Sequence, residues 1–132
     1  MVSPSAARSK ILVIDDNADV TKALKVVLEL NGAQVTIFND PVQAVKRFRA
    51  REYDLVLLDF QMPDMDGFEV YRHLKKVDDD VRVCLLTSFD VYEREFATVF
   101  PGAKIHAFLK KPVETRSLLK ILNALAPEER TR

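Results

Sequence analysis

The sequence predicts an α/β fold in which a five-stranded parallel sheet lies between two layers of helices. Two features of the sequence predict it. Short apolar runs rich in β-branched residues alternate five times with segments of helical periodicity, a pattern typical of parallel sheets with helices on both faces. The runs ILVI and LVLL are apolar at every position and indicate central strands, whereas VTIF alternates and indicates an edge strand.

The first half of the chain supplies three of the strands and two of the helices. The first helix has Asn17 or Asp19 near its start, and Asn31-Gly32 ends it because glycine tolerates the turn after a last helical residue. Pro41 opens the second helix, where a missing N–H costs nothing. The expected strands are Lys10–Asp15, Gln34–Phe38 and Asp54–Asp59, and the expected inward residues are Val20, Ala23, Leu24, Val27 and Leu28 in the first helix and Val42, Val45 and Phe48 in the second.

The second half of the chain continues the alternation. The expected strands are Val81–Thr87 and Ile105–Leu109, and the expected helices are Gly67–Lys76, Val91–Phe100 and Glu114–Ala126. Charged and apolar residues mix in the last strand, which therefore fits the edge opposite VTIF. Central first and third strands with an outer second strand fit the flavodoxin-like order 2-1-3-4-5. The domain is expected over residues 10–126, with 1–9 as a flexible lead-in and 127–132 as a charged tail.

The composition is that of one ordinary globular domain. The 132 residues fit a single domain, with 48% hydrophobic and 30% charged residues. The net charge is zero, so no basic excess favours nucleic acid or anionic membranes, and no apolar run is long enough to span a bilayer. The single cysteine, Cys84, suits a reducing compartment. We therefore expect a cytoplasmic protein that binds neither nucleic acid nor membrane directly.

Polar side chains gather where the predicted strands end. In open α/β sheets, ligands bind beyond the carboxyl ends of the strands, at the switch between strands one and three. The residues at those ends are Asp15-Asp16 for strand one, Asp59 for strand three, Thr87-Ser88 for strand four and Lys110-Lys111-Pro112 for strand five. Three carboxylates, two hydroxyls and an ammonium group are thus expected on one rim of the sheet.

Carboxylates brought together at this rim need a counter-charge. Two of them held about 4 Å apart repel by roughly 4 kcal/mol at an effective dielectric near 20, so either one takes up a proton or a cation binds. Oxygen ligands without a neighbouring histidine or cysteine suit a hard ion such as Mg²⁺. A lysine and hydroxyls beside that ion can hold an anion that the ion also touches. Such a site suits phosphoryl transfer, with Asp59 as the candidate nucleophile.

Four segments carry a resemblance to a known family. ILVIDDN, YDLVLLDFQMPDMDGFEV, LLT and FLKKP stand in the order and spacing of the receiver domain of two-component response regulators, which the chain resembles from about Lys10 to Ala126. The resemblance implies that Asp59 accepts a phosphoryl group and that Thr87 and Lys111 grip its oxygens. It also implies a Mg²⁺ site and a pair of switch residues. The implied metal ligands are Asp15, Asp16, Asp59 and the backbone carbonyl of Gln61, and the implied switch residues are Thr87 and Phe108.

The function implied by the resemblance is a phosphorylation-dependent signalling switch. A sensor histidine kinase, a phosphotransfer protein or a small phosphodonor would supply the phosphoryl group. The face formed by the fourth helix, the last strand and the last helix would then bind a downstream protein or a second copy of the chain. Such a protein catalyses only its own phosphorylation and dephosphorylation and is not a turnover enzyme. The chain is expected to carry no output domain. The family also holds the bond Lys111–Pro112 in the cis form.

Other interpretations of the same residues remain open. Asp15-Asp16 could cap the first helix, and either Lys110 or Lys111 could be the solvated one of the pair, with the proline favouring Lys111 at the site. A metal-dependent phosphohydrolase also clusters acids on an α/β rim, but a dehalogenase-type phosphatase needs D-x-D after the first strand, where this chain has Asp15-Asp16-Asn17. A P-loop is absent too, and two acids replace the phosphate loop of flavodoxins. A receiver-like domain that only docks partners would not need Asp59 and Lys111.

Overall fold

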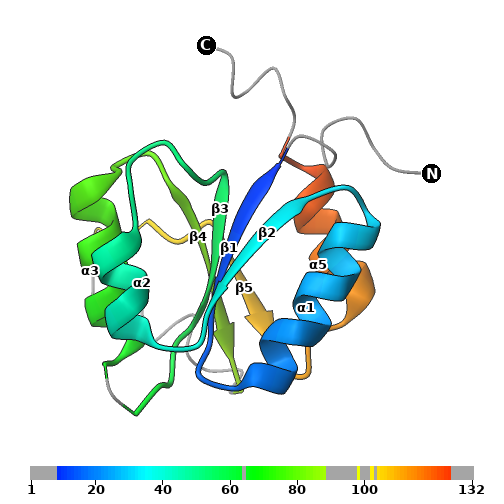
Figure 1. Ribbon diagram of the computed structural model, residues 1–132, viewed down its shortest axis with the longest axis horizontal. Helices are drawn as coiled ribbons and strands as arrows, with labels where there is room; N and C mark the ends of the chain where they lie inside the picture. The colour runs from blue at the N-terminus through cyan, green and yellow to red at the C-terminus, as the bar shows by residue number, and fades with distance from the viewer. Residues whose placement is uncertain (1–8, 64, 89–97, 99–101, 103, 126–132) are drawn as a thin grey trace.

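The computed structural model describes residues 9–63, 65–88, 98, 102 and 104–125 (Figure 1). The elements within them are β1 (Lys10–Ile14), α1 (Ala18–Leu30), β2 (Gln34–Phe38), α2 (Pro41–Arg47), β3 (Leu55–Asp59), α3 (Gly67–Val77), β4 (Arg82–Thr87), β5 (Ala107–Lys110) and α5 (Thr115–Asn123). The helix predicted over 91–100 lies outside the described residues except for Thr98, so the labels pass from α3 to α5. No helix in the described part of the chain is long and apolar enough to cross a membrane.

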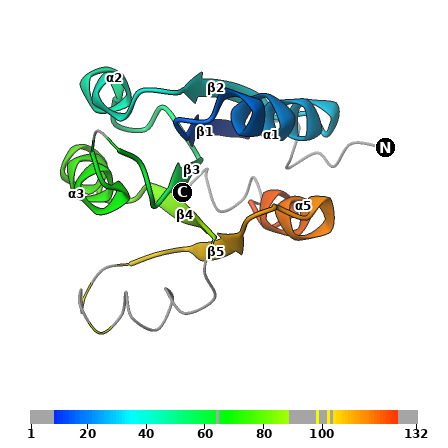
Figure 2. The same ribbon diagram turned by 90° about the horizontal axis from the view of Figure 1, so that it is seen from below.

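The sheet confirms the predicted flavodoxin-like topology. Its five strands are all parallel and lie in the order β2-β1-β3-β4-β5. Figure 2 shows α1 and α5 on one face of the sheet and α2 and α3 on the other. Ile14 at the end of β1 pairs with Phe38 on β2 and with Leu58 on β3, so the carboxyl ends of these strands lie side by side.

The core forms two clusters, one on each face of the sheet. Successive side chains of a strand point to opposite faces, so alternate residues of β1, β3 and β4 enter alternate clusters. β1 and β3 are buried at almost every position, which confirms them as the central strands, whereas β2 is exposed or half-buried throughout. The cluster under α2 and α3 includes Leu12, Val56, Leu85 and Leu74, and the cluster under α1 and α5 includes Val13, Leu57, Leu28 and Leu118.

The helix starts and inward faces differ in detail from the predictions. Asn17, not Asp19, caps α1, and its side chain accepts bonds from the backbone N–H groups of Asp19 and Val20. Ala23, predicted to face inward, is exposed. Thr21 is buried on the inner face of α1, a position that a hydrophobic pattern does not assign to a polar residue. In α2 the buried residues are Pro41 and Ala44, whereas the predicted Val42 and Val45 are half-buried. Phe48, also predicted to face inward, is buried but follows the helix, which ends at Arg47.

The last strand begins later than predicted, at Ala107 in place of Ile105. The segment before it is held by a side chain from α3: the backbone N–H of Lys104 donates to the Tyr71 hydroxyl at 2.7 Å, and that hydroxyl donates to the Lys104 carbonyl at 3.2 Å. Pairing with β4 starts where the N–H of His106 donates to the Val83 carbonyl at 2.9 Å. Tyr71 thus occupies backbone groups that an earlier strand start would have used.

Candidate functional site

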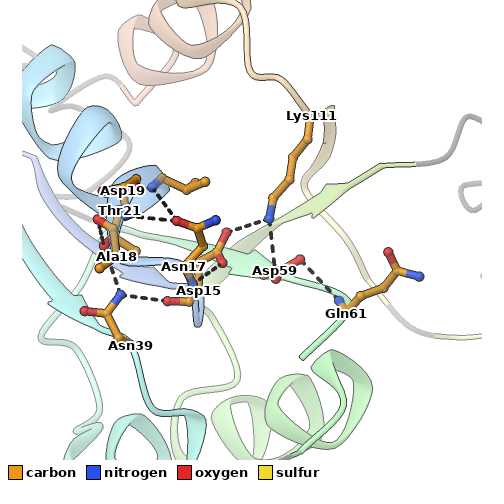
Figure 3. Close-up of polar contacts among 10 residues, drawn as sticks. Asp15, Asn17, Ala18, Asp19, Thr21, Asn39, Asp59, Gln61 and Lys111 are labelled. Carbon is orange, nitrogen blue, oxygen red and sulfur yellow. Dashed lines mark hydrogen bonds and ion pairs between the residues drawn. The ribbon is translucent and has the colours of Figure 1, made fainter. Parts of the chain in front are cut away.

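Three of the residues predicted at the strand ends, Asp15, Asp59 and Lys111, meet at one rim of the sheet (Figure 3), whereas Ser88 and Lys110 are exposed. Asp15 follows β1, Asp59 is the last residue of β3, and Lys111 follows β5. Carboxylate oxygens of Asp15, Asp16 and Asp59 lie within 4.8 Å of one another. Asp15 and Asp59 are buried, whereas Asp16 is exposed. The structure therefore brings together a deep pair of carboxylates and a third one at the surface.

Asp15 is directed into the site by hydrogen bonds on both sides of it. Its backbone N–H donates to the Phe38 carbonyl at 3.2 Å, which continues the ladder between β1 and β2. Its Oδ1 accepts the N–H of Asn17 at 2.9 Å, and Asn17 in turn caps α1. These local hydrogen bonds fix the loop from β1 into α1. They use Asp15 Oδ1 and leave Asp15 Oδ2 facing the rim.

Asp59 is held between the strand and the loop that follows it. Its Oδ1 accepts the N–H of Gln61 at 3.2 Å, and the N–H of Phe60 donates to the Leu86 carbonyl on β4 at 3.0 Å. The side chain of Gln61 is exposed, and Figure 3 shows it pointing away from the carboxylates. A role for Gln61 in binding a metal therefore depends on its backbone carbonyl alone.

Lys111, and not Lys110, faces the carboxylates. Its ammonium nitrogen lies 2.7 Å from Asp15 Oδ2 and 3.4 Å from Asp59 Oδ2. Its backbone N–H donates to the Thr87 carbonyl at 2.7 Å, which fixes the start of the loop after β5. The Lys111–Pro112 peptide bond is cis, as the family resemblance implies. Lys110 is exposed. One cation is thus shared by two buried carboxylates.

The electrostatics of this group favour an additional cation. Burial and then the charge of Asp15 raise the pKa of Asp59 to about 6, although Lys111 opposes the shift. Burial lowers the pKa of Lys111, but its bond to Asp15 and the charges of both carboxylates outweigh burial and leave that pKa raised. Three ionised carboxylates against one ammonium leave two negative charges uncompensated within the cluster.

The donor set fits a hard divalent ion. All the ligand atoms are oxygens, and no histidine or cysteine belongs to the cluster found among the described residues. Asp15 Oδ2 is fully buried, and its one polar partner in the described part of the chain is the Lys111 ammonium. A buried carboxylate oxygen with a single contact has capacity for another cation. Asp15, Asp16 and Asp59 are therefore suited to hold Mg²⁺.

Thr87 and Phe108, the predicted switch residues, lie on neighbouring strands. Thr87 ends β4 and is buried, and the register pairs it with Lys110. Phe108 pairs with Leu85 and is half-buried against the cluster under α2 and α3. The structure thus places Thr87 on the rim and Phe108 on β5.

Gly67 is required by a close approach of backbone, because its φ angle is not positive. Its N–H donates to the Phe60 carbonyl at 3.1 Å and closes the loop after Asp59. A Cβ atom at Gly67 would lie 2.7 Å from both the Asp59 carbonyl oxygen and Phe60 Cα. The acidic residue before it, Asp66, caps α3 by accepting the N–H of Glu69. Asp64, the acid two residues before Asp66, lies outside the described residues.

We expect Gly67→Ala to distort the site as well as to lower stability. The added methyl group must displace backbone that belongs to Asp59 and Phe60, which costs about 1–3 kcal/mol of unfolding free energy in a packed region. Urea unfolding measures the loss, and the rate of phosphorylation by a small phosphodonor measures the distortion. Gly102→Ala is the comparison, because Gly102 has nothing within 4 Å and strains only its own φ of +98°. Equal phosphorylation rates in the two variants would contradict the prediction.

Two residues of the site region were missed by the sequence reasoning. Asn39 follows β2, and its side-chain nitrogen donates to the Asp15 carbonyl at 2.8 Å and to Thr21 Oγ1 at 3.0 Å. Thr21 lies in the first turns of α1 and is buried. The signal for Asn39 was available: it is a polar residue at the carboxyl end of the second strand, the one strand end not considered.

Comparisons with known proteins agree with this geometry. The chain matches the family described as the response regulator receiver domain over residues 11–123. It is similar to the response regulator MprA of Mycobacterium ulcerans, with 34% identity over 116 residues that make up 88% of this chain and 49% of that protein. The chain thus spans about half the length of the curated relatives it matches.

Solved structures give the same result. The receiver domain of the Francisella response regulator 1452 is 27% identical, with a TM-score of 0.76 over 95% of this chain and 100% of that chain. A response regulator receiver domain protein from Clostridium thermocellum is 25% identical, with a TM-score of 0.76 over 92% of this chain and 97% of that chain. Both likenesses extend over nearly the whole of each chain.

Proposed function

Since this chain belongs to the response regulator receiver domain family, we propose that it is a phosphorylation-dependent signalling switch whose phosphoacceptor is Asp59. The observation that carries this proposal is the position of the Asp59 carboxylate. It lies buried at the end of a central strand, 3.4 Å from the Lys111 ammonium and within reach of two further carboxylates. A carboxylate with a raised pKa is a better nucleophile than an exposed one, and a pKa of about 6 still leaves it ionised at neutral pH.

In the proposed reaction, a carboxylate oxygen of Asp59 attacks the phosphorus of a donor. A phosphorus–oxygen bond forms as the bond from phosphorus to the donor breaks, and the electron pair leaves with an imidazole nitrogen of a phosphohistidine or with the acetate of acetyl phosphate. Lys111 and Thr87 grip the phosphoryl oxygens. Asp15, Asp16, Asp59 and the Gln61 carbonyl would hold Mg²⁺, which supplies positive charge for the phosphoryl oxygens when bound. The product is an acyl phosphate, not a released molecule, so the protein acts as a switch and not as a turnover enzyme.

The partners follow from this role. A sensor histidine kinase or a phosphotransfer protein would donate the phosphoryl group, and Thr87 and Phe108 would pass the change to the face that contains β5 and α5. That face carries an open hollow of about 590 Å³, lined among others by Phe108, Lys110 and Ile121, which supports docking of a downstream protein or a second copy. We place the protein in the cytoplasm and assign it no nucleic-acid or membrane ligand.

The proposal is tested by intact mass spectrometry after incubation with acetyl phosphate, with Mg²⁺ and with EDTA in its place. We expect a gain of one phosphoryl group that requires Mg²⁺, because the carboxylate cluster repels a phosphodonor until its charge is neutralised. No gain in either condition, with binding of a kinase retained, would favour a receiver-like domain that only docks partners.

A further inference from the structure

The backbone of Asp15 is fixed from the side of the edge strand by two bonds of different kinds. Its N–H donates to the Phe38 carbonyl at 3.2 Å, and its C=O accepts from the side-chain nitrogen of Asn39 at 2.8 Å. In a parallel ladder with Ile14 opposite Phe38, the next bond to the Asp15 carbonyl would come from the N–H of Asp40. The Asn39 amide therefore supplies, from a side chain, the bond that a longer β2 would have supplied from its backbone.

The same amide nitrogen also ties the metal-site loop to α1. It donates a second bond to Thr21 Oγ1 at 3.0 Å, and the Thr21 hydroxyl donates onward to the Ala18 carbonyl at 3.1 Å (Figure 3). The hydroxyl proton of Thr21 is donated to the Ala18 carbonyl, so Thr21 Oγ1 can only accept a bond from Asn39. The Asp15 carbonyl has no proton and can likewise only accept. The orientation of the amide is thus set by chemistry, and both of its protons have acceptors.

We propose that Asn39 is a positioning residue for the Mg²⁺ site, which it serves by fixing the peptide unit between Asp15 and Asp16. The carbonyl that Asn39 holds belongs to that unit, so its direction sets the direction of both carboxylates. With the N–H of Asp15 held by Phe38, the backbone angles of Asp15 have little freedom. A metal ion needs its carboxylates at a defined separation, and the partners of its ligands are known to tune its affinity. The inference rests on the proposed function.

A purely structural role for Asn39 is the competing interpretation. The Asn39 side chain is exposed, so water can replace its bonds in a variant, and the fold should survive its loss. Water does not constrain the direction of the Asp15 carbonyl in the same way, because it is not anchored to β2 and Thr21. The two roles therefore differ in one observable quantity: the affinity for Mg²⁺ at an unchanged thermal midpoint.

The test is the Mg²⁺ dissociation constant of Asn39→Ala, measured by titration calorimetry on the whole chain with its melting temperature recorded in parallel. We expect the constant to rise about 10-fold, at the lower end of the range for partners of metal ligands. The matched control is Asn31→Ala. Its side-chain nitrogen also donates to a backbone carbonyl, that of Val27, at 2.8 Å, but at the far end of α1. We expect its Mg²⁺ affinity to equal that of the unmodified protein.

The outcomes separate the possibilities. An unchanged Mg²⁺ affinity in Asn39→Ala, or an equal loss in Asn31→Ala, overturns the inference while the proposed function stands. An unmodified protein that does not bind Mg²⁺ overturns the proposed function itself. Should Asn39→Ala fail to fold, Thr21→Val replaces it as the test. That change removes one of the two acceptors of the amide, so we expect a smaller rise in the same constant, and no rise would overturn the inference.

Discussion

Asp59→Asn is expected to abolish phosphorylation and, without Mg²⁺, to make the protein more stable at neutral pH. The first effect follows because an amide oxygen is not a nucleophile for phosphoryl transfer, whereas the ionised carboxylate is. We expect no gain in intact mass with acetyl phosphate and Mg²⁺ under conditions that phosphorylate the unmodified chain. A gain of equal size in the variant would show that another residue accepts the phosphoryl group and would remove Asp59 from its assigned role.

The second effect follows from the pKa of Asp59, which is raised from 3.8 to about 6 by burial and by Asp15. A carboxyl group whose pKa is raised by folding binds its proton more tightly in the folded state. Its contribution to stability is therefore greatest below about pH 4 and is lost as the pH rises through about 6. Above that range the ionised group destabilises the fold, and the neutral amide does not. At neutral pH the unfolding free energy of the Asp59→Asn variant should then exceed that of the unmodified protein by about 1–3 kcal/mol, at about 1.4 kcal/mol per pKa unit.

Urea unfolding in EDTA at several pH values measures this difference. The gain should be large at pH 7.5 and should shrink towards pH 4, where Asp59 takes up its proton. Mg²⁺ should also reduce it, because an ion bound only by the unmodified cluster stabilises that protein. Asp66→Asn is the matched control: Asp66 is exposed and caps α3 with one side-chain oxygen, which Asn retains. The same gain in that variant, or a gain that does not depend on pH, would contradict the electrostatic explanation.

The strands and the rim could be predicted from the sequence because their signals are local and strong. Continuous apolar runs are typical of strands buried on both faces, so within the alternation of strands and helices β1 and β3 could be placed in the middle of the sheet. The acids that follow them then had to meet, because parallel strands end on the same edge. The choice of Lys111 over Lys110 rested on the proline that follows it, and the distances to Asp15 and Asp59 agree with that choice.

What could not be predicted depends on contacts between distant segments. The start of β5 is delayed by the Tyr71 hydroxyl on α3, and no pattern near Ala107 carries that information. Thr21 was not recognised as an inner residue of α1 because a hydrophobic pattern assigns polar residues to solvent. Asn39 acts across the sheet on Asp15, so its role depends on the register of β2 with β1. Hydrogen bonds made by side chains across the fold are thus the part of this site that a sequence pattern leaves open.

Lys111→Met is expected to weaken phosphorylation and to strengthen Mg²⁺ binding, two effects of opposite sign from one substitution. The ammonium is the one counter-charge of the Asp15–Asp59 pair among the described residues, at 2.7 and 3.4 Å. Removing it leaves uncompensated buried charge, which should lower the unfolding free energy in EDTA by about 3 kcal/mol. An added cation then binds a more negative site, so its affinity should rise.

The loss of phosphorylation should nevertheless exceed any gain in metal binding. Lys111 is the positive group assigned to the phosphoryl oxygens, and removing one such group from a transition state costs roughly 10²–10³-fold in rate. Saturating Mg²⁺ should therefore restore stability without restoring the rate of phosphorylation by acetyl phosphate. Lys110→Met is the matched control, because it removes the same charge from the adjacent exposed position. Its phosphorylation rate, Mg²⁺ affinity and unfolding free energy should stay near those of the unmodified protein. If Lys111→Met kept its full rate at saturating Mg²⁺, the lysine would serve only to balance the carboxylates, and the phosphoryl oxygens would need another partner.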